Sequence, residues 1–267
     1  MKSRLLTIVC LLLSTFPASA DPLVARFESN MGDFDVLLDP IAAPRSVDNF
    51  SAYANRGAYD VTIIHRSTTY NPLDIQIVQG GGFELVGNTL PPIPSDPPIP
   101  LEAGRANALG TLAMARTSDP DSATSQWFFN VTDNPGLDFN YAVFGSVLGA
   151  GQNVIEAIGS VPVYNASAQL GPVFGQLPLL SPSLSVDYLV LINRIRVAPF
   201  AITSLTHASE AVEIRWTQLS TNSPVRVERR EKLGHGSWSV VSSNNTTGIF
   251  YDTNTPTGSA FYRVVTE

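Results

Sequence analysis

The chain has 267 residues, 44% of them hydrophobic, and its 16 basic and 23 acidic side chains give a formal net charge of -7. This length can bury a sizeable core in one large or two smaller domains. The negative charge argues against nucleic acid and anionic membranes as partners. Nineteen glycines and twenty prolines favour short strands and turns over long helices.

The first twenty residues have the pattern of an export signal. Lys2 and Arg4 precede an apolar run from Leu5 to Leu13, and the small residues Ala18-Ser19-Ala20 follow. The apolar run is too short to span a bilayer, so we expect cleavage before Asp21 and no membrane insertion. The mature chain is then expected to be exported, to the periplasm or the extracellular space, with 14 basic and 23 acidic residues.

Several classes of chemistry lack support in this sequence. Cys10 is the only cysteine and lies inside the expected signal, so the mature chain can form no disulfide. None of the three histidines accompanies a G-x-S-x-G turn, and the H-E-x-x-H, P-loop and dinucleotide motifs are absent. We therefore expect no catalytic triad, no metal site and no cofactor.

The first half of the mature chain predicts a small barrel. Residues 23–28 and 34–38 predict a hairpin, and Pro44 opens a helix that ends near Gly57. Its expected buried face consists of Val47, Phe50, Tyr53 and Ala54. The further predicted elements are strands at 61–65, 75–79, 110–116, 126–131 and 141–148, and a second helix at 153–158. Many strands and two helices indicate a closed barrel capped at its ends.

The second half changes character at Pro199. Before it, the proline-rich stretch 91–100 reads as a surface connector, and an irregular stretch at about 162–185 precedes an apolar strand at 186–197. After it, strands are expected at 212–216, 225–230, 238–241 and 261–265, with His207, His235, Arg229 and Arg230 as solvated surface residues. This small unit resembles a fibronectin type III sandwich that is one strand short. The expected organisation is a signal peptide at 1–20, a barrel domain at 21–198 and a β domain at 199–267.

A polar residue stands inside an aromatic strand at Gln126-Trp127-Phe128-Phe129. An unpaired amide in an apolar setting costs a few kcal/mol, so Gln126 needs a hydrogen-bond partner, either a bound peptide or a neighbouring polar side chain. Side chains alternate along a strand. We therefore assign Trp127 to the core and Phe128 to a groove.

Four segments carry a family resemblance. They are, in chain order, "IIHRS" at 63–67, "IVQGGGF" at 77–83, "NALGTLAMARTSDPDSATSQWFFNV" at 107–131 and "GLDFNYAVFGSV" at 136–147. Over roughly residues 23–197 the chain resembles the cyclophilin family of peptidyl-prolyl cis/trans isomerases, in its bacterial form. The resemblance implies a mainly β fold with a closed eight-stranded barrel capped by two helices. It also implies no cofactor, and a monomer whose partners are Pro-containing peptides and unfolded client proteins.

The resemblance also assigns a site. Arg66 would be the catalytic donor, because a twisted imide regains a lone pair on the proline nitrogen that a fixed cation binds more strongly than the planar form. Gln79 would be catalytic too, by orienting Arg66. The implied substrate-binding residues are His65, Ile77, Ala115, Arg116, Gln126, Phe128, Leu137 and Tyr141, and no metal is implied.

The sequence departs from the family pattern at three places. Gln76 stands where an aromatic is usual, and the stretch 67–75 is longer than usual, so Leu73 or Ile75 could replace the missing ring. Gly136 replaces a frequent Trp, from which we expect weak cyclosporin binding. Two other hypotheses stay open: a catalytically weak binding module for Pro-containing peptides with the C-terminal domain as its docking arm, and a secreted β-rich adhesion or carbohydrate-binding protein.

Overall fold

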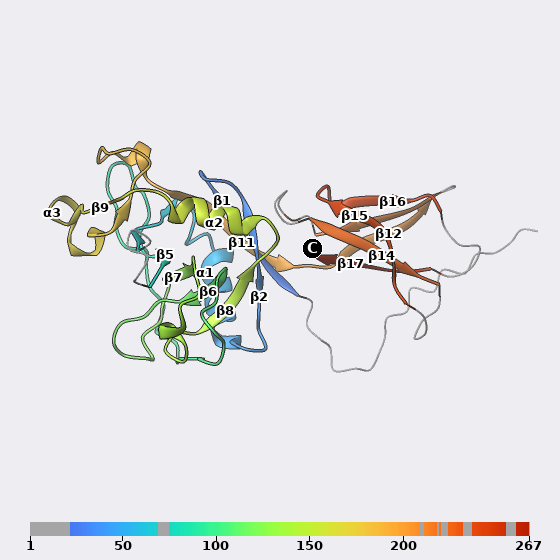
Figure 1. Cartoon of the computed structure of the whole chain (residues 1–267), viewed down its shortest axis with the longest axis horizontal. Coiled ribbons are helices and arrows are strands. Elements are labelled where there is room, and N and C mark those ends of the chain that lie inside the picture. The colour runs from blue at the N-terminus through green and yellow to red at the C-terminus, as the bar shows by residue number, and fades with distance from the viewer. Residues whose placement is uncertain are drawn as a thin grey trace, which may run out of the picture. The chain divides into compact units, whose positions relative to one another are not determined.

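The computed structural model describes residues 22–68, 75–208, 211–217, 219, 224–231, 237–254 and 260–266. The chain divides into two compact units, the larger spanning Leu23–Ala198 and the other built from Pro199 onward (Figure 1). In the described part of the chain no helix is both long and apolar enough to cross a membrane. The expected signal peptide lies outside the described residues.

The larger unit is built on one sheet whose strand order is β3-β11-β1-β2-β8-β6-β7-β5-β4. The strands are β1 (Leu23–Ser29), β2 (Phe34–Leu38), β3 (Thr62–Ile63), β4 (Arg66–Ser67), β5 (Ile77–Gly80), β6 (Thr111–Met114), β7 (Trp127–Asn130), β8 (Val143–Val147) and β11 (Leu191–Pro199).

The two ends of this sheet, β3 and β4, are consecutive pieces of one stretch of chain. Between them the Ile64 N–H donates to the Val190 carbonyl and the His65 N–H donates to the Gln79 carbonyl, both at 3.0 Å. The sheet therefore returns on itself through residues 62–67. The mainly β barrel is confirmed, with nine strand segments where eight strands were expected, because this one strand is interrupted.

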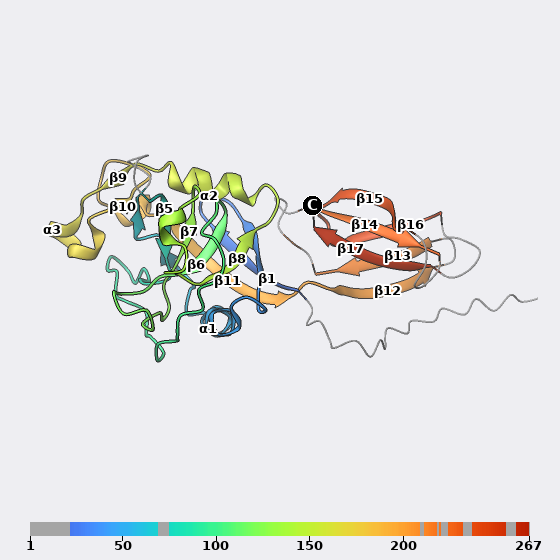
Figure 2. The same cartoon turned by 60° about the horizontal axis from the view of Figure 1, so that its bottom comes forward.

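Helices cover the strands. The bounds are α1 (Pro44–Asn55), α2 (Gly151–Gly159) and α3 (Ser167–Leu170), with short 3₁₀ turns η1 (Pro135–Leu137), η2 (Pro172–Phe174) and η3 (Val186–Tyr188). In Figure 2, α1 and α2 lie on opposite sides of the strands. The first helix begins at a proline, which lacks the N–H that a helix start leaves unpaired, and it buries the predicted face. The short α3 was not expected, and η3 replaces the start of the strand predicted at 186–197.

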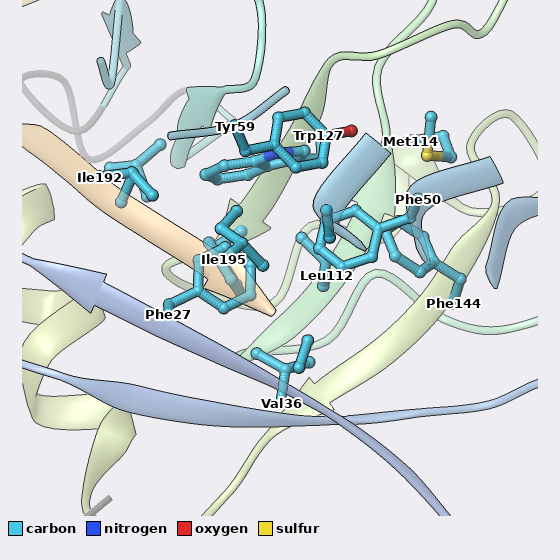
Figure 3. Close-up of a cluster of buried hydrophobic side chains, with 14 of the residues drawn as sticks. Phe27, Val36, Phe50, Tyr59, Leu112, Met114, Trp127, Phe144, Ile192 and Ile195 are labelled. Atoms are coloured by element: carbon cyan, nitrogen blue, oxygen red, sulfur yellow. The ribbon is translucent and has the colours of Figure 1, made fainter. Parts of the chain in front are cut away.

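An aromatic cluster fills the barrel (Figure 3). The Phe27 ring lies 4.8 Å from the Phe34 ring, 5.3 Å from Trp127 and 5.4 Å from Phe129, centroid to centroid. All four side chains are essentially inaccessible to water. Burying one such ring removes about 200 Å² of surface, about 5 kcal/mol before entropic costs. These rings hold the strands that carry the site.

Two connecting stretches differ from expectation. The proline-rich stretch 91–100 stays out of the sheet as expected, but Ile93 is 4% exposed and belongs to the core, so the stretch is more than a surface connector. The irregular stretch contains the two-stranded pair β9 (Val163–Tyr164) and β10 (Leu177–Pro178). Both stretches bury side chains that their composition alone predicts to lie on the surface.

The smaller unit forms two three-stranded sheets, ordered β12-β13-β16 and β15-β14-β17. The strands are β12 (Ile202–Ala208), β13 (Ala211–Trp216), β14 (Val225–Arg230), β15 (Ser239–Asn245), β16 (Ile249–Asp252) and β17 (Phe261–Thr266). The strands β12 and β16 were not predicted. The likeness to a fibronectin type III sandwich stays a prediction.

One surface assignment in this unit is wrong. The Arg229 side chain is 17% exposed and donates to the Asp252 carboxylate at 2.7 Å, because that carboxylate is nearly buried and needs a counter-charge. The Tyr262 hydroxyl donates to the same carboxylate at 2.8 Å. The side chains of His207 and His235 lie outside the described residues.

Candidate active site

A cavity of about 560 Å³ lies over the strands β4, β5, β6 and β7. Its walls are formed by Arg66, Thr68, Ile75, Ile77, Gln79, Ala115, Arg116, Phe128, Leu137, Tyr141 and Gln176. Eight of the ten predicted site residues are among them; His65 and Gln126 are not. Across the described residues, no three His, Cys, Asp or Glu side chains gather closely enough to hold a metal ion.

The floor of the cavity is apolar. Phe128 is 2% exposed and packs in a small cluster with Ile77 and Leu137. The Tyr141 ring meets the Phe128 ring edge-on at 5.4 Å. Trp127, the preceding residue, is fully buried in the core cluster. The assignment of these two neighbouring rings to opposite faces of β7 is therefore confirmed.

The glycines after Gln79 make room for the side chains of β7. A Cβ at Gly80 would lie 2.6 Å from the Trp127 ring, and one at Gly81 would lie 2.5 Å from the same indole. A Cβ at Gly82 would lie 2.9 Å from the Gln126 amide. The run of three glycines is thus a packing requirement that fixes both Trp127 and Gln126.

The polar wall of the cavity is a chain of hydrogen bonds centred on Arg66. Its Nε donates to Gln176 Oε1 at 2.9 Å, and its Nη1 donates to Gln79 Oε1 at 3.2 Å. The Gln79 amide in turn donates to Gln126 Oε1 at 2.8 Å. Gln126 therefore has the partner its position requires, and that partner is a neighbouring side chain. Two glutamine oxygens fix the guanidinium without neutralising its charge.

Gln176 is a site residue that the sequence analysis missed. It lies in the irregular stretch, just before β10, and its carbonyl accepts the Ser67 N–H at 2.9 Å. That backbone contact carries the Gln176 side chain to Arg66 across 110 residues of sequence. No local pattern marks this residue, because its neighbours have neither strand nor helix periodicity.

Arg116 forms the opposite wall. Its Cζ lies 4.8 Å from the centre of the Tyr141 ring. Its Nε donates to the Asn140 carbonyl at 2.7 Å, and its Nη1 donates to the Thr117 carbonyl at 2.8 Å and less closely to Ser118. The guanidinium is held by backbone oxygens and an aromatic face. Like Arg66, it stays a full positive charge at the cavity wall.

The structure places His65 apart from the residues that line the cavity. Its side chain is 1% exposed and packs against the Phe83 ring, 5.0 Å between centroids. His65 belongs to neither β3 nor β4, and it is not among the residues that line the cavity. Burial, with the charge of Arg66 as the second cause, lowers the pKa of His65 to about 4. Its expected role in substrate binding stays a prediction.

The departures from the family pattern leave the cavity open. Ile75 lines it, as expected for a replacement of the missing aromatic, whereas Leu73 lies outside the described residues. The main chain of Gln76 is bound on both sides by the Asn134 side chain, at 3.0 Å each. Thr68 donates its N–H to the Ile77 carbonyl at 3.0 Å. The ends of the longer connection are thus tied to β5.

The sequence comparisons point to one family. The family model for "Cyclophilin type peptidyl-prolyl cis-trans isomerase/CLD" matches residues 24–173. A peptidyl-prolyl cis-trans isomerase of Acinetobacter baylyi is 40% identical over 169 residues, 61% of this chain and 85% of the relative. Peptidyl-prolyl cis-trans isomerase A of Dickeya dadantii is 39% identical over 178 residues, 62% of this chain and 88% of the relative. The crystal structure of a Cryptosporidium parvum cyclophilin type isomerase in the presence of the dipeptide Ala-Pro aligns with a TM-score of 0.48 and 21% identity, covering 66% of this chain and 98% of that one.

Proposed function

Because the chain belongs to the cyclophilin type peptidyl-prolyl cis-trans isomerase family, we propose that it is an exported isomerase that accelerates X-Pro bond rotation in client proteins outside the cytoplasm. One observation carries the proposal. Arg66 faces a cavity with an apolar floor around Phe128, and two glutamine oxygens hold its guanidinium. Export is proposed from the signal pattern of residues 1–20.

The reaction requires no nucleophile. Amide resonance sets a rotation barrier of about 18 to 20 kcal/mol, while the two X-Pro isomers differ by only about 1 kcal/mol. A catalyst therefore needs only to favour the twisted imide over both planar forms. Each tenfold gain in rate takes about 1.4 kcal/mol of such preference.

The residues divide this task between them. Phe128, Ile77 and Leu137 hold the proline ring, so rotation takes place in the chain that precedes it. In the twisted state the imide nitrogen carries a lone pair, and Arg66 donates an N–H to it. The Tyr141 hydroxyl, at the rim, is placed to donate to a peptide carbonyl. Because the guanidinium is already fixed, little reorganisation is needed at the moment of twisting.

The test is isomerisation of a short X-Pro peptide by the mature chain, beside Arg66→Ala. We expect catalysis well above the uncatalysed rate and a loss of about 100-fold in kcat/KM in the variant, as for removal of one fixed transition-state donor. Arg45→Ala is the matched control, because Arg45 is exposed on α1 and outside the cavity. A flat trace with measurable peptide binding would instead favour the binding module.

Export has a separate test. Expression of the full chain in a bacterial host, followed by fractionation and N-terminal sequencing, should give a product outside the cytoplasm that begins at Asp21. A cytoplasmic product that retains Met1 would refute export and leave the isomerase proposal standing.

A further inference from the structure

The charges of the larger unit are unevenly paired. Between residues 23 and 198 the sequence has eight arginines and no lysine against sixteen acidic residues. Five of these arginines form ion pairs, namely Arg26, Arg56, Arg105, Arg194 and Arg196. Of the other three, Arg45 is exposed on α1, and Arg66 and Arg116 both line the cavity. No carboxylate belongs to the cavity wall that the structure describes.

Among the residues that the structure describes, two positive charges in an acidic unit therefore face one cavity without a counter-ion. Every guanidinium holds five N–H donors and no acceptor, so it is satisfied best by a carboxylate. Asp119 and Asp121, which follow Arg116 in the chain, are not part of the described cavity wall and accept backbone N–H groups instead, from Asp121 at 3.0 Å and from Leu101 at 2.9 Å. The cavity thus offers an unmet demand for negative charge.

The two arginines are not equivalent in this respect. Arg66 is held by glutamine side chains at the pocket for the proline ring, where its free donors are required by the imide nitrogen. Arg116 is held by backbone oxygens through Nε and Nη1, and within the described residues its Nη2 has no hydrogen-bond partner. A ligand carboxylate is therefore better matched to Arg116.

The distance between Arg116 and the pocket for the proline ring limits which residue of a bound peptide can carry that carboxylate. The Arg116 guanidinium is 4.8 Å from the Tyr141 ring, and that ring is 5.4 Å from Phe128. The span from guanidinium to pocket floor is at most about 10 Å, the length of about three extended residues. The carboxylate must then belong to a residue close to the proline in sequence.

We propose that this cavity selects peptides that carry an aspartate or glutamate within three residues of the proline, and that Arg116 binds that carboxylate. The selection rests on the proposed isomerase function. Because the ion pair forms equally in the planar and twisted states of the imide, it strengthens binding of both and lowers KM without raising kcat. Arg116 is accordingly a specificity residue, distinct from Arg66.

The test uses matched X-Pro peptides with Glu, Gln or Lys placed one, two or three residues before or after the proline. At the peptide position with the largest effect, we expect the mature protein to have about fivefold higher kcat/KM for the Glu peptide than for the Gln peptide, and the lowest value for the Lys peptide. The difference should lie in KM and not in kcat. Raising the salt concentration should shrink the Glu preference, because exposed charges are screened. Arg116→Gln should bring the Glu-to-Gln ratio close to one, and Arg116→Lys should keep part of it.

Arg45→Gln is the control, since it removes the same charge away from the cavity and should leave the ratio unchanged. Equal turnover of Glu, Gln and Lys peptides at every position would overturn the selection while leaving the isomerase function intact. An equal loss of preference in the Arg116 and Arg45 variants would overturn the role of Arg116. No turnover of any peptide would overturn the proposed function, and the selection with it.

Discussion

The two faces of strand β7 differ in what surrounds their side chains. On the inner face, Trp127 and Phe129 are enclosed by rings on all sides and belong to the core. On the outer face, Phe128 is packed from below and opens onto the cavity. One four-residue strand thus supplies both stability and a binding surface. The site can be rigid because the strand that carries it is fixed from behind.

The same contrast holds for polar groups. His65 is buried against Phe83 and lines no part of the cavity, whereas Gln126, Gln79 and Arg66 form a connected chain of hydrogen bonds at the cavity. The cavity wall keeps the charge of Arg66 without a paired carboxylate among the residues that line it. Substitutions on the two faces should therefore have separable effects on stability and on turnover.

The largest effect is expected on the inner face. Trp127→Ala removes an indole that is fully buried among aromatic rings, and should lower the free energy of unfolding by about 4 kcal/mol. Urea unfolding of the mature protein, followed by circular dichroism, measures this loss. Ile41→Ala is the control, because Ile41 is 90% exposed and should change stability by less than about 0.5 kcal/mol. Similar losses in both variants would contradict the division of β7 into two faces.

On the outer face Phe128→Leu should act mainly on turnover. The side chain stays apolar and similar in volume, so the unfolding free energy should fall by only about 1 kcal/mol. The flat wall beneath the proline ring is lost, and we expect kcat/KM to fall about 50-fold, within the range for a changed hydrophobic pocket. Peptide isomerisation and urea unfolding on the same sample measure the two effects. A variant that is strongly destabilised but fully active would reverse the comparison.

Acid should act through the buried side chain of His65. His65 has a pKa of about 4 in the folded chain against 6.5 for the free side chain, because burial disfavours its charged form. Between pH 6.5 and pH 4 the unfolded chain therefore binds a proton that the folded chain does not. This part of the stability is fully present above pH 6.5 and declines by about 1.4 kcal/mol per pH unit below it.

From pH 7 to pH 5 we therefore expect a loss of about 2 kcal/mol from His65. The measurement is the urea unfolding free energy at several pH values for the wild-type chain and for His65→Gln, which cannot titrate in this range. The carboxylates and the other histidines are common to both proteins, so the difference isolates His65. Parallel pH profiles would show that His65 is not held neutral.

Most of this arrangement could be predicted from the sequence. The parts that could not be predicted depend on contacts between residues far apart in the chain. Alternation along β7 and the cost of an unpaired amide were enough to separate Trp127 from Phe128 and to require a partner for Gln126. The family resemblance supplied the expected roles of Arg66 and Gln79. The same resemblance assigned His65 to the groove, whereas its side chain is buried against Phe83 and is not part of the cavity wall.

Other misses have the same physical origin. The strand β16 has only four residues and β12 has an irregular hydrophobic pattern, so pairing with β13 stabilises both more than their own sequence does. Ile93 is buried and Ile99 packs against the core although most of the proline-rich stretch is exposed, and only tertiary packing decides which side chains turn inward. Gln176 reaches Arg66 only through pairing between Ser67 and a distant irregular stretch.

Substitution of Gln176 is expected to have the smallest effect of these variants. It tests whether the polar wall of the cavity acts by positioning Arg66. Gln176→Leu removes the acceptor at Arg66 Nε and leaves the one at Nη1, so the guanidinium stays present but is held at one point instead of two. We expect kcat to fall about tenfold with little change in KM, because Arg66 bonds the imide nitrogen only in the twisted state. Gln169→Leu, at an exposed glutamine of α3, is the matched control.

A double-mutant cycle with Arg66→Lys then separates positioning from folding. A lysine lacks the planar guanidinium whose Nε–H donates to Gln176. In the Arg66→Lys background, Gln176→Leu should therefore change kcat very little. The coupling free energy between the two positions should equal most of the effect of Gln176→Leu in the wild-type chain. Equal losses in the two backgrounds would mean that Gln176 supports the fold and not the guanidinium. If the fall in kcat disappears when Arg66 is already replaced, Gln176 acts by positioning the guanidinium of Arg66. Neither strand periodicity nor the family pattern identifies Gln176 as a site residue.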